Sequence, residues 1–330
     1  MHSNPVWITE AEVAQSMDLR GAIVALEHGL TLEAGGRART MAKTHIAWGN
    51  GNTLHSLGGS LEGARLVGVK SWAHTTGGAC PLLLLWDSEN GGLRAVIEAF
   101  ALGQLRTGSM SAVATRWMAA ADASSMALIG TGKQAMTQVA AVASVRPLRE
   151  VRVFSPTAER RAAFVKELSA AGLGFEVIEA ESVRDAVSKS QIVTLATRAR
   201  EPFLSAQMMS PGTHVNAIGA VTPERQEFRP DVVARAGLIV TDEPAAARRL
   251  SRELMDYFAD DAAGWQSVKP LSSIVAQGRG RPAGCHLSLF KAMGMGAADV
   301  ALGAEVLREV LARGGGRPLE APVRVKLRLV

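Results

Sequence analysis

The stretch MALIGTGKQAMTQ, residues 126–138, places a glycine-rich turn between an apolar run and an alanine-rich segment. Gly130 lets the backbone turn sharply, Gly132 lets it approach a phosphate without a Cβ in the way, and Ala135 lets the following helix pack closely on its strand. We therefore expect this turn to bind the pyrophosphate of a dinucleotide. Its residues are Gly130, Thr131, Gly132, Lys133, Gln134 and Ala135.

The end of the next apolar run, EVRVFS, indicates which dinucleotide binds. An acidic residue there would accept hydrogen bonds from the ribose 2′-hydroxyl of NAD, but this chain has Ser155 and Thr157, followed by Arg160 and Arg161. Hydroxyls and a guanidinium group suit a 2′-phosphate. We expect NADP(H) to be favoured over NAD(H), with Ser155, Thr157 and Arg160 as ligands. Arg161 is the alternative to Arg160, and both arginines could instead only solvate an exposed helix.

Three cations lie earlier in the chain, at expected strand ends and turns: Lys43, Lys70 and Arg106. Lys70 closes the apolar run LVGVKSW, so its ammonium group should be aimed at a partner. Arg106 stands just ahead of a helix expected over 109–118, where backbone donors are free to bind an anion. Together the three residues predict a site for a carboxylate substrate, although each alone is more often a surface charge.

Two kinds of segment must position these residues. From residue 126, apolar runs alternate with helical patterns, which predicts a parallel, doubly wound sheet covered by helices on both faces. The expected strands are 126–129, 150–155, 175–180, 192–197, 214–220 and 237–243.

Residues 1–120 alternate less regularly. A helix is expected over 19–36, followed by the β-type runs THIAW, ARLVGVKSW and PLLLLWD, which glycine-rich loops separate. The run at 321–330 alternates apolar and basic residues, and we expect it to return to this part as a strand. These segments predict a mixed α/β lobe.

The composition excludes several classes of protein. A length of 330 residues suits two domains, and no stretch approaches the roughly 18 consecutive apolar residues of a membrane span. The net charge of +5 comes from scattered basic residues without interleaved aromatic ones, so we expect no nucleic-acid and no membrane partner. Cys80 and Cys285 lie outside any metal-ligand spacing, so no metal is expected, and the start of the chain is unlike a secretory signal, which fits a cytoplasmic protein.

Several stretches resemble the ornithine cyclodeaminase and mu-crystallin family. In chain order they are GVKSW, LRTGSMSAVATRWMA, LIGTGKQA, HVNAIGAVTPERQEF, GLIVTDE and SLFKAMGMGAADVA. The resemblance implies an α/β fold in which a Rossmann domain, 119–303, is inserted in a mixed α/β lobe built from 1–118 and 304–330. That lobe would bind the substrate and form a homodimer.

The resemblance also implies roles for single residues. Lys43, Lys70 and Arg106 would hold the carboxylate of a small imino or amino acid, and Lys70 would take part in catalysis. Asp299 matches a recurrent family acid near the nicotinamide; it could otherwise be a carboxylate on a helix surface. The remaining expected cofactor contacts are Thr107, Ala196, Thr197, Ile218 and Val221.

Two departures from the family pattern bear on the reaction. Cyclodeaminases resemble one another in an aspartate two residues before a proline, where this chain has Val221. Valine transfers no proton, so deamination should be slowed, whereas reduction of a preformed imine does not require this acid/base group. His55 falls where a pocket methionine is usual; with a pKa near neutrality it could donate a proton or bind a second polar group, or be an ordinary loop histidine.

These features predict NAD(P)H-dependent reduction of a small cyclic α-imino acid, Δ1-pyrroline-2-carboxylate or Δ1-piperideine-2-carboxylate, to the L-amino acid. One alternative is reduction of an acyclic imine formed from a keto acid and an amine, as in alanine or aspartate dehydrogenases. Another is a crystallin-like protein that binds NADPH and a ligand without turnover. Ornithine cyclodeaminase is the weakest alternative.

Overall fold

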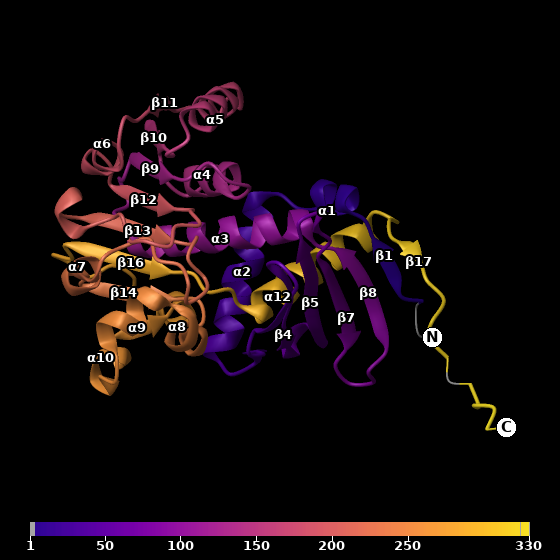
Figure 1. Ribbon diagram of the computed structural model, residues 1–330. Coiled ribbons are helices and arrows are strands. Elements are labelled where there is room, and N and C mark those ends of the chain that lie inside the picture. Colours follow the sequence, from indigo (N-terminus) through magenta and orange to yellow (C-terminus); the bar gives the residue numbers. More distant parts are fainter. Residues whose placement is uncertain (1–3, 324, 330) are drawn as a thin grey trace. The chain divides into compact units, whose positions relative to one another are not determined.

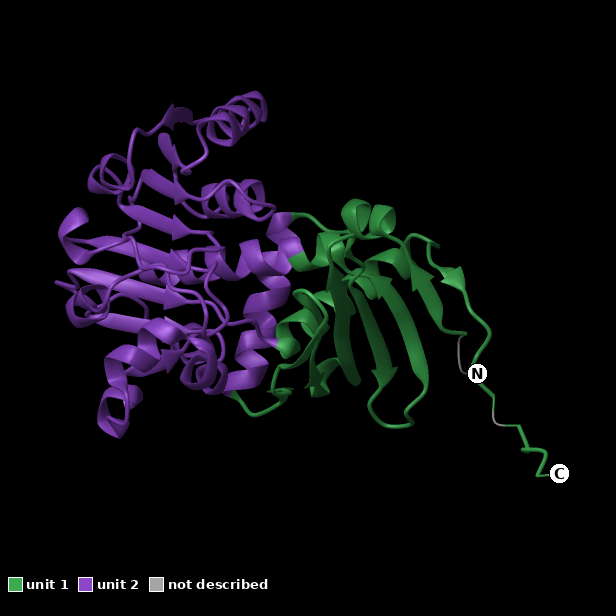
Figure 2. Cartoon of the chain, in the orientation of Figure 1, with its two compact units in different colours: residues 1–18, 35–103, 296–330 green, residues 19–34, 104–295 purple. Residues whose placement is uncertain are grey.

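The computed structural model describes residues 4–323 and 325–329 (Figure 1). The chain divides into two compact units (Figure 2). Unit 1 comprises residues 1–18, 35–103 and 296–330, and unit 2 comprises 19–34 and 104–295. Within the described residues, no helix has the length and apolar character needed to cross a membrane.

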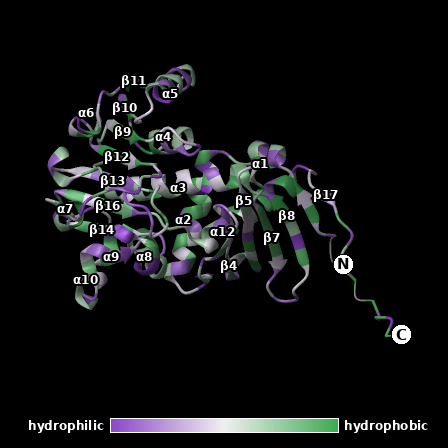
Figure 3. Ribbon diagram, in the orientation of Figure 1, coloured by the Kyte–Doolittle hydropathy of each residue, from purple (hydrophilic) through white to green (hydrophobic). Residues whose placement is uncertain are grey.

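The described residues of unit 1 form a nine-stranded sheet in the order β17-β1-β8-β7-β5-β4-β2, with β3 beside β4 and β6 beside β5. The strands are β1 (Val6–Ile8), β2 (Ala38–Thr40), β3 (Thr44–Trp48), β4 (Asn52–Leu61), β5 (Leu66–Thr75), β6 (Gly78–Ala79), β7 (Leu82–Asp87), β8 (Leu93–Glu98) and β17 (Arg317–Pro318). The helices are α1 (Glu10–Ser16), the 3-10 turn η1 (Glu62–Ala64) and α12 (Gly296–Ala312). The leucines at 82–85 make β7 one of the hydrophobic strands in Figure 3.

The glycine-rich sequence that we expected to be a loop is the ten-residue strand β4. Helix α12 packs against this strand with its backbone in close contact. A Cβ at Gly59 would lie 2.6 Å from the Cα of Ala297, and one at Gly296 would lie 2.0 Å from the carbonyl oxygen of Gly58. The glycines therefore allow the helix to pack closely on the strand. In the sequence alone, such glycines look the same as the glycines of a loop.

Unit 2 contains an eight-stranded sheet, with every neighbouring pair parallel among the described residues, in the order β11-β10-β9-β12-β13-β16-β14-β15. The strands are β9 (Ser125–Ile129), β10 (Glu150–Phe154), β11 (Glu176–Glu179), β12 (Ile192–Leu195), β13 (Thr213–Ala217), β14 (Leu238–Thr241), β15 (Val268–Pro270) and β16 (Leu287–Lys291). This order, with the first strand of the unit at the reversal point, confirms the doubly wound α/β domain.

Helices connect these strands and cover both faces of the sheet. They are α2 (Leu19–Ala34), α3 (Phe100–Met118), α4 (Ala135–Ala143), α5 (Ala158–Ala170), α6 (Val183–Ser188), η2 (Ala206–Met208), α7 (Pro230–Arg235), α8 (Pro244–Leu250), α9 (Arg252–Phe258), α10 (Ala262–Gln266) and α11 (Leu271–Gln277).

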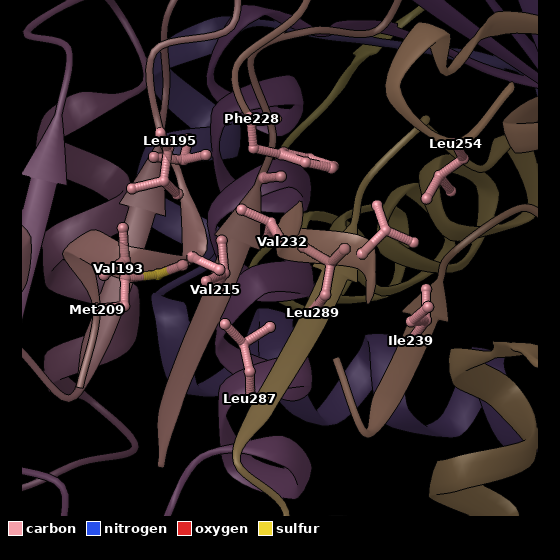
Figure 4. Close-up of a cluster of buried hydrophobic side chains, with 14 of the residues drawn as sticks. Val193, Leu195, Met209, Val215, Phe228, Val232, Ile239, Leu254, Leu287 and Leu289 are labelled. Carbon is pink, nitrogen blue, oxygen red and sulfur yellow. The ribbon is translucent and has the colours of Figure 1, made fainter. Parts of the chain in front are cut away.

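Two hydrophobic clusters form the core of unit 2. Successive residues of β9 alternate between them: Met126 and Leu128 belong to one cluster, and Ala127 and Ile129 belong to the other. This alternation is the two-residue period of a strand with both faces buried. Figure 4 shows part of the larger cluster, in which Phe228 lies among branched side chains of β12, β13 and β16.

The two units differ from the ranges expected for the two lobes, 1–118 with 304–330 and 119–303. Helix α2 packs on α11, so residues 19–34 fall in unit 2. Residues 104–118 of α3 fall there as well. At the other junction, α12 is one unbroken helix from Gly296 to Ala312, so a boundary at 304 would divide it, and unit 1 resumes at 296.

Two strand expectations also need correction. The six strands expected from residue 126 are present with ends within three residues, but β15 and β16 were not anticipated, because short buried strands lack a distinctive period. The run at 321–330 was expected to be a strand, and its described residues form none. Val323, Val325, Leu327 and Leu329 are each at least 78% exposed.

Candidate active site

A cavity of about 480 Å³ opens in unit 2 at the carboxyl ends of β9, β10 and β12. The residues that line it are Ile129, Gly130, Thr131, Gly132, Phe154, Ser155, Pro156, Thr157, Arg160, Val183, Ala196, Thr197, Arg198, Ala199 and Phe203. This edge, beside the reversal of strand order, is where doubly wound sheets bind nucleotides. The cavity therefore brings together most of the residues expected to hold the cofactor.

The glycine turn fits a dinucleotide. Gly130 has φ of +103°, and a Cβ there would lie 2.5 Å from the carbonyl oxygen of Ala196, so a side chain is excluded on both counts. At Gly132 nothing lies within 4 Å of the Cβ position, which leaves open space where a phosphate group can approach the backbone. Helix α4 begins just beyond, at Ala135, with its N-terminal donors close to this turn.

The end of β10 separates the two candidate arginines. Arg161 donates hydrogen bonds to Glu179 Oε1 at 2.8 Å and to the carbonyl oxygen of Ser155 at 2.6 Å. Arg160 is exposed and lines the cavity together with Ser155 and Thr157. Arg160 is thus a lining residue of the cavity, whereas Arg161 holds the strand end.

Some expected cofactor residues do not line this cavity. Lys133 is exposed, and its carbonyl oxygen accepts a hydrogen bond from Gln104 at 3.3 Å. Gln134 is the N-cap of α4. Ile218 and Val221 follow β13, one strand further along the sheet. Thr107 lies inside α3, where its carbonyl oxygen accepts a hydrogen bond from Ser111 at 3.4 Å.

Sequence reasoning also missed residues of the cavity. Arg198 adds a second guanidinium group to Arg160, and the rings of Phe154 and Phe203 add apolar surface. Arg198, in the sequence ATRAR, directly follows the strand expected over 192–197. A basic residue at the end of a strand could therefore have indicated this part of the cavity.

In unit 1, Lys70 and Asp299 form a buried ion pair. Lys70 is on β5 and Asp299 is on α12, and Nζ of the lysine donates to Oδ1 of the aspartate at 2.6 Å. Their side chains are 6% and 0% exposed. Lys70 is therefore aimed at a partner, as its place at the end of an apolar run indicated, and Asp299 is not a carboxylate on a helix surface.

His55 lies on the same face of the sheet, in a stack of rings. Its centroid is 5.6 Å from that of His45 and 4.9 Å from that of Trp72, with interplanar angles of 23° and 21°. Its Nε2 atom is 2.9 Å from Oγ1 of Thr53. His55 is thus a fixed, half-buried residue of β4 and not a loop histidine facing water.

The surroundings of His55 exclude the protonated form near neutral pH. Burial first, and then the nearby basic groups Lys43, His45 and His74, together lower the pKa of His55 to about 4. The expectation of a pKa near neutrality is therefore wrong. Lys43 itself is half-buried, between β2 and β3, close enough to His55 to influence its charge.

Arg106 differs from its expected setting. Helix α3 begins at Phe100, so Arg106 lies within the helix and not ahead of it. The free donors at the true start are already used, because the carboxylate of Glu10 accepts hydrogen bonds from the backbone of Phe100 and Ala101. In unit 2 the guanidinium of Arg106 lies near Asp242, where burial raises the pKa of the carboxyl group and Arg106 opposes that rise.

The described residues contain no group of three or more His, Cys, Asp or Glu side chains that could hold a metal ion.

The chain is similar in sequence to proteins of known activity. The chain is 26% identical over 241 residues to a Delta(1)-pyrroline-2-carboxylate reductase of Bacillus cereus, which covers 72% of this chain and 74% of that protein. It is 26% identical over 324 residues to an iminosuccinate reductase of Paracoccus denitrificans, covering 95% and 99%.

A solved structure shares the fold over its full length. Thermococcus litoralis Delta(1)-pyrroline-2-carboxylate reductase, in complex with NADH and L-proline, matches with a TM-score of 0.89 at 25% identity, over 95% of this chain and 100% of that one. The sequence profile described as the ornithine cyclodeaminase/mu-crystallin family matches residues 4–314. This protein therefore belongs to the ornithine cyclodeaminase/mu-crystallin family.

Proposed function

We propose that this chain is an NAD(P)H-dependent reductase of small α-imino acids, and that its substrate is cyclic, Δ1-pyrroline-2-carboxylate or Δ1-piperideine-2-carboxylate. The observation that carries the proposal is the buried pair of Lys70 and Asp299, which holds an ammonium group rigidly on the sheet of unit 1. A fixed ammonium group suits the carboxylate that every α-imino acid carries. The similarity to Delta(1)-pyrroline-2-carboxylate reductases supports the same substrate class.

When bound, the nicotinamide supplies a hydride to the imine carbon. The chain's own residues bind and orient: Lys43 and Lys70 hold the substrate carboxylate, with Arg106 as a third cation. The loop after β13, residues 218–223, contains no ionisable side chain. Reduction of an imine that arrives protonated needs no acid there, whereas release of ammonia from an amino acid does.

His55 acts as a neutral hydrogen-bonding group in this proposal. With a pKa of about 4 it carries no proton to donate as an imidazolium ion near pH 7. Stacked between His45 and Trp72, it orients the substrate and leaves proton supply to the protonated imine itself.

We propose NADP(H) as the preferred form of the cofactor. Ser155, Thr157 and Arg160 line the cavity beside the end of β10, and Arg198 adds a further positive charge. No acidic residue is among the described residues that line this cavity. A 2′-phosphate therefore meets cations and hydroxyls and no repelling carboxylate.

A direct assay tests the proposal. Purified protein, NADPH or NADH and either cyclic imine should give loss of nicotinamide absorbance and formation of L-proline or L-pipecolate. Tight cofactor binding with no turnover of either imine would favour a non-catalytic, crystallin-like protein. Ammonia release from ornithine with NAD would favour a cyclodeaminase.

A second candidate is an acyclic imine with two carboxylates. Lys43, His45 and His74 surround His55 with basic groups, which suits a second anionic group on the substrate. The iminosuccinate reductase matches almost the whole chain. Oxaloacetate with ammonia should then be reduced faster than pyruvate with ammonia and faster than the cyclic imines.

We further propose that the protein is a homodimer that works in the cytoplasm. Ile46, Trp48, Leu54 and Val67 lie on the face of the unit 1 sheet opposite Lys70 and are 63%, 43%, 42% and 38% exposed. Exposed large apolar side chains on one face of a sheet are typical of an interface with a second copy. Both cysteines, Cys80 and Cys285, are free thiols, as suits a reducing compartment.

A further inference from the structure

Glu227 connects the ends of two neighbouring strands in unit 2. It lies between β13 and α7 and is completely buried, at 0% exposure. Oε1 accepts hydrogen bonds from the backbone N of Thr197 at 2.7 Å and from its Oγ1 at 2.8 Å. Oε2 accepts from the backbone N of Gly219 at 2.9 Å and of Ala220 at 3.1 Å. Since Thr197 follows β12 and Gly219 follows β13, one carboxylate joins both strand ends.

A second layer of charges holds Glu227 in place. The backbone N of Glu227 donates to Oε1 of Glu253 at 3.1 Å. Lys291 Nζ donates to the carbonyl oxygen of Ala220 at 2.6 Å and lies 3.1 Å from Oε2 of Glu253. Burial keeps the pKa of Glu227 above its ordinary value, and the Lys291 ammonium and the hydrogen bonds from Thr197 offset only part of that rise. Because each oxygen of Glu227 accepts two hydrogen bonds, the geometry suits the ionised carboxylate.

Two sets of contacts set the spacing of the strand-end loops: contacts of their backbones with each other, and hydrogen bonds to Glu227. A Cβ at Gly219 would lie 2.2 Å from the carbonyl oxygen of Thr197 and 2.5 Å from Oε1 of Glu227. Thr197 in turn lines the nucleotide cavity. The spacing of the two loops is therefore set by backbone contact on one side and by the buried carboxylate on the other.

The position of these loops in the sheet indicates which half of a dinucleotide they meet. In a doubly wound sheet each half of the dinucleotide lies over one half of the strands, on either side of the reversal point. The cavity residues Ser155 and Arg160 belong to the β10 side, where the adenosine ribose is expected. Strands β12 and β13 lie on the other side of β9, which receives the nicotinamide half.

We propose that Glu227 is a positioning residue for the nicotinamide half of the cofactor, acting through the loops at 196–199 and 218–221. The inference rests on the proposed function, because it assumes that a nicotinamide cofactor binds this unit. Glu227 itself is enclosed by its donors and touches no reacting group. Its part is to keep the two loops at the separation that the nicotinamide ribose and ring require.

The experiment compares whole and truncated cofactor. Binding of NADPH and NADH is measured by fluorescence, and binding of ADP-ribose and its 2′-phosphate by calorimetry, for the wild type and for Glu227→Gln. Glutamine presents a donor to one of the two loops in place of an acceptor. We expect dissociation constants for the reduced dinucleotides to rise on the order of tenfold, and those for the ADP-ribose probes to stay within about twofold.

Asp231→Asn is the matched control. Asp231 accepts a hydrogen bond from the backbone N of Ala206 at 3.0 Å and does not line the cavity. Replacing it also removes a carboxylate that binds a backbone donor in the same unit. All four dissociation constants should remain at the wild-type values in this variant.

The outcomes are distinct. Unchanged dinucleotide binding in Glu227→Gln, or an equal loss for dinucleotides and ADP-ribose probes, would overturn the inference alone. A wild-type protein that binds no nicotinamide cofactor would overturn the proposed function, and the inference with it. If Glu227→Gln fails to fold by circular dichroism, Glu227→Asp replaces it under the same criterion. Aspartate keeps the charge but is one methylene too short to reach both loops.

Discussion

Lys70 Nζ lies 2.6 Å from Oδ1 of Asp299, between a strand and a helix whose contacting residues are 229 positions apart in the chain. The pair connects strand β5 and helix α12 of unit 1 through two side chains that are almost completely buried. A buried charge that loses its partner is expensive, so each residue depends on the other. The proposed carboxylate-binding ammonium group is thus also a structural element of its unit.

Asp299→Asn should destabilise the protein by about 3–5 kcal/mol, because it removes the carboxylate charge that lies 2.6 Å from the buried Lys70 ammonium. Adding Lys70→Met should restore part of that loss. Urea unfolding of the wild type, of Asp299→Asn and of the double variant measures both effects. Asp256→Asn removes the partner of Arg252 in an exposed pair, 48% and 46% exposed, and should change the stability by less than about 0.5 kcal/mol. An Asp299→Asn protein as stable as the wild type would contradict the prediction.

His55 should stay neutral throughout the neutral pH range. Its folded pKa of about 4 is below the ordinary value of 6.5, so the unfolded chain binds the proton more readily. The stability that neutral His55 contributes is therefore fully present above pH 6.5 and is lost as the pH falls towards 4. The imidazole resonance of His55, assigned by comparison with His55→Gln, should not shift between about pH 6 and 8. A resonance titrating near 6.5 would refute this account.

Arg160→Leu should raise the KM for NADPH by about tenfold and leave the KM for NADH unchanged, because it removes a charge-assisted hydrogen bond to the 2′-phosphate. Steady-state kinetics with each cofactor provide the test. Arg184→Leu is the control, since Arg184 is an exposed arginine of α6 that does not line the cavity. An equal change in the KM for NADPH and for NADH in Arg160→Leu would contradict the proposal that Arg160 binds the 2′-phosphate.

Arg146→Met should destabilise the protein by about 2–4 kcal/mol. Arg146 is 8% exposed, and its guanidinium group supplies hydrogen bonds at the end of α3. Its acceptors there are the carbonyl oxygens of Thr115, Arg116, Ala119 and Ala120, at 2.8–3.1 Å. Without it, the carbonyl oxygens of Arg116 and Ala119 lose this charged donor, while those of Thr115 and Ala120 keep only the backbone donors of Ala119 and Ala123. Arg149→Met, at an exposed position three residues on, should have little effect in the same urea titration. Equal stability of the two variants would contradict this role.

Ile46→Glu should convert the proposed dimer to a monomer. Ile46 is 63% exposed, so a carboxylate there leaves the fold of unit 1 intact but places a charge in the apolar interface. Light scattering coupled to size exclusion gives the mass. Val24→Glu is matched in exposure, at 60% on helix α2, and should remain dimeric. A monomeric wild type, or a dimeric Ile46→Glu, would rule out this face as the interface.

Local sequence patterns were sufficient to predict most of the nucleotide site. The glycine turn at 130–132 and the hydroxyl and arginine residues after β10 lie within about 30 positions of one another, and the structure places them around one cavity. Such arrangements are predictable because the βα unit fixes them over a short stretch of chain. Arg161 could not be separated from Arg160 in this way, since its partner Glu179 belongs to another strand.

Features that depend on distant contacts could not be read from the sequence. Strand β4 contains glycines because α12 lies against it, and the sequence around residue 58 does not indicate that a helix packs there. The low pKa of His55 comes from burial and from charges on neighbouring strands. Glu227 lies close in sequence to Val221, but its hydrogen bonds to both loops depend on β12 and β13 lying side by side.

Strand β16, the last of unit 2 to be synthesised, lies inside the sheet, between β13 and β14. A nascent chain that has not yet emerged as far as residue 291 therefore presents β14 and β15 without the neighbour that joins them to the rest. Open strand edges of this kind invite pairing with other polypeptides. A chain released before residue 287 lacks β16, so β14 and β15 have no strand that connects them to β13 and the rest of the sheet.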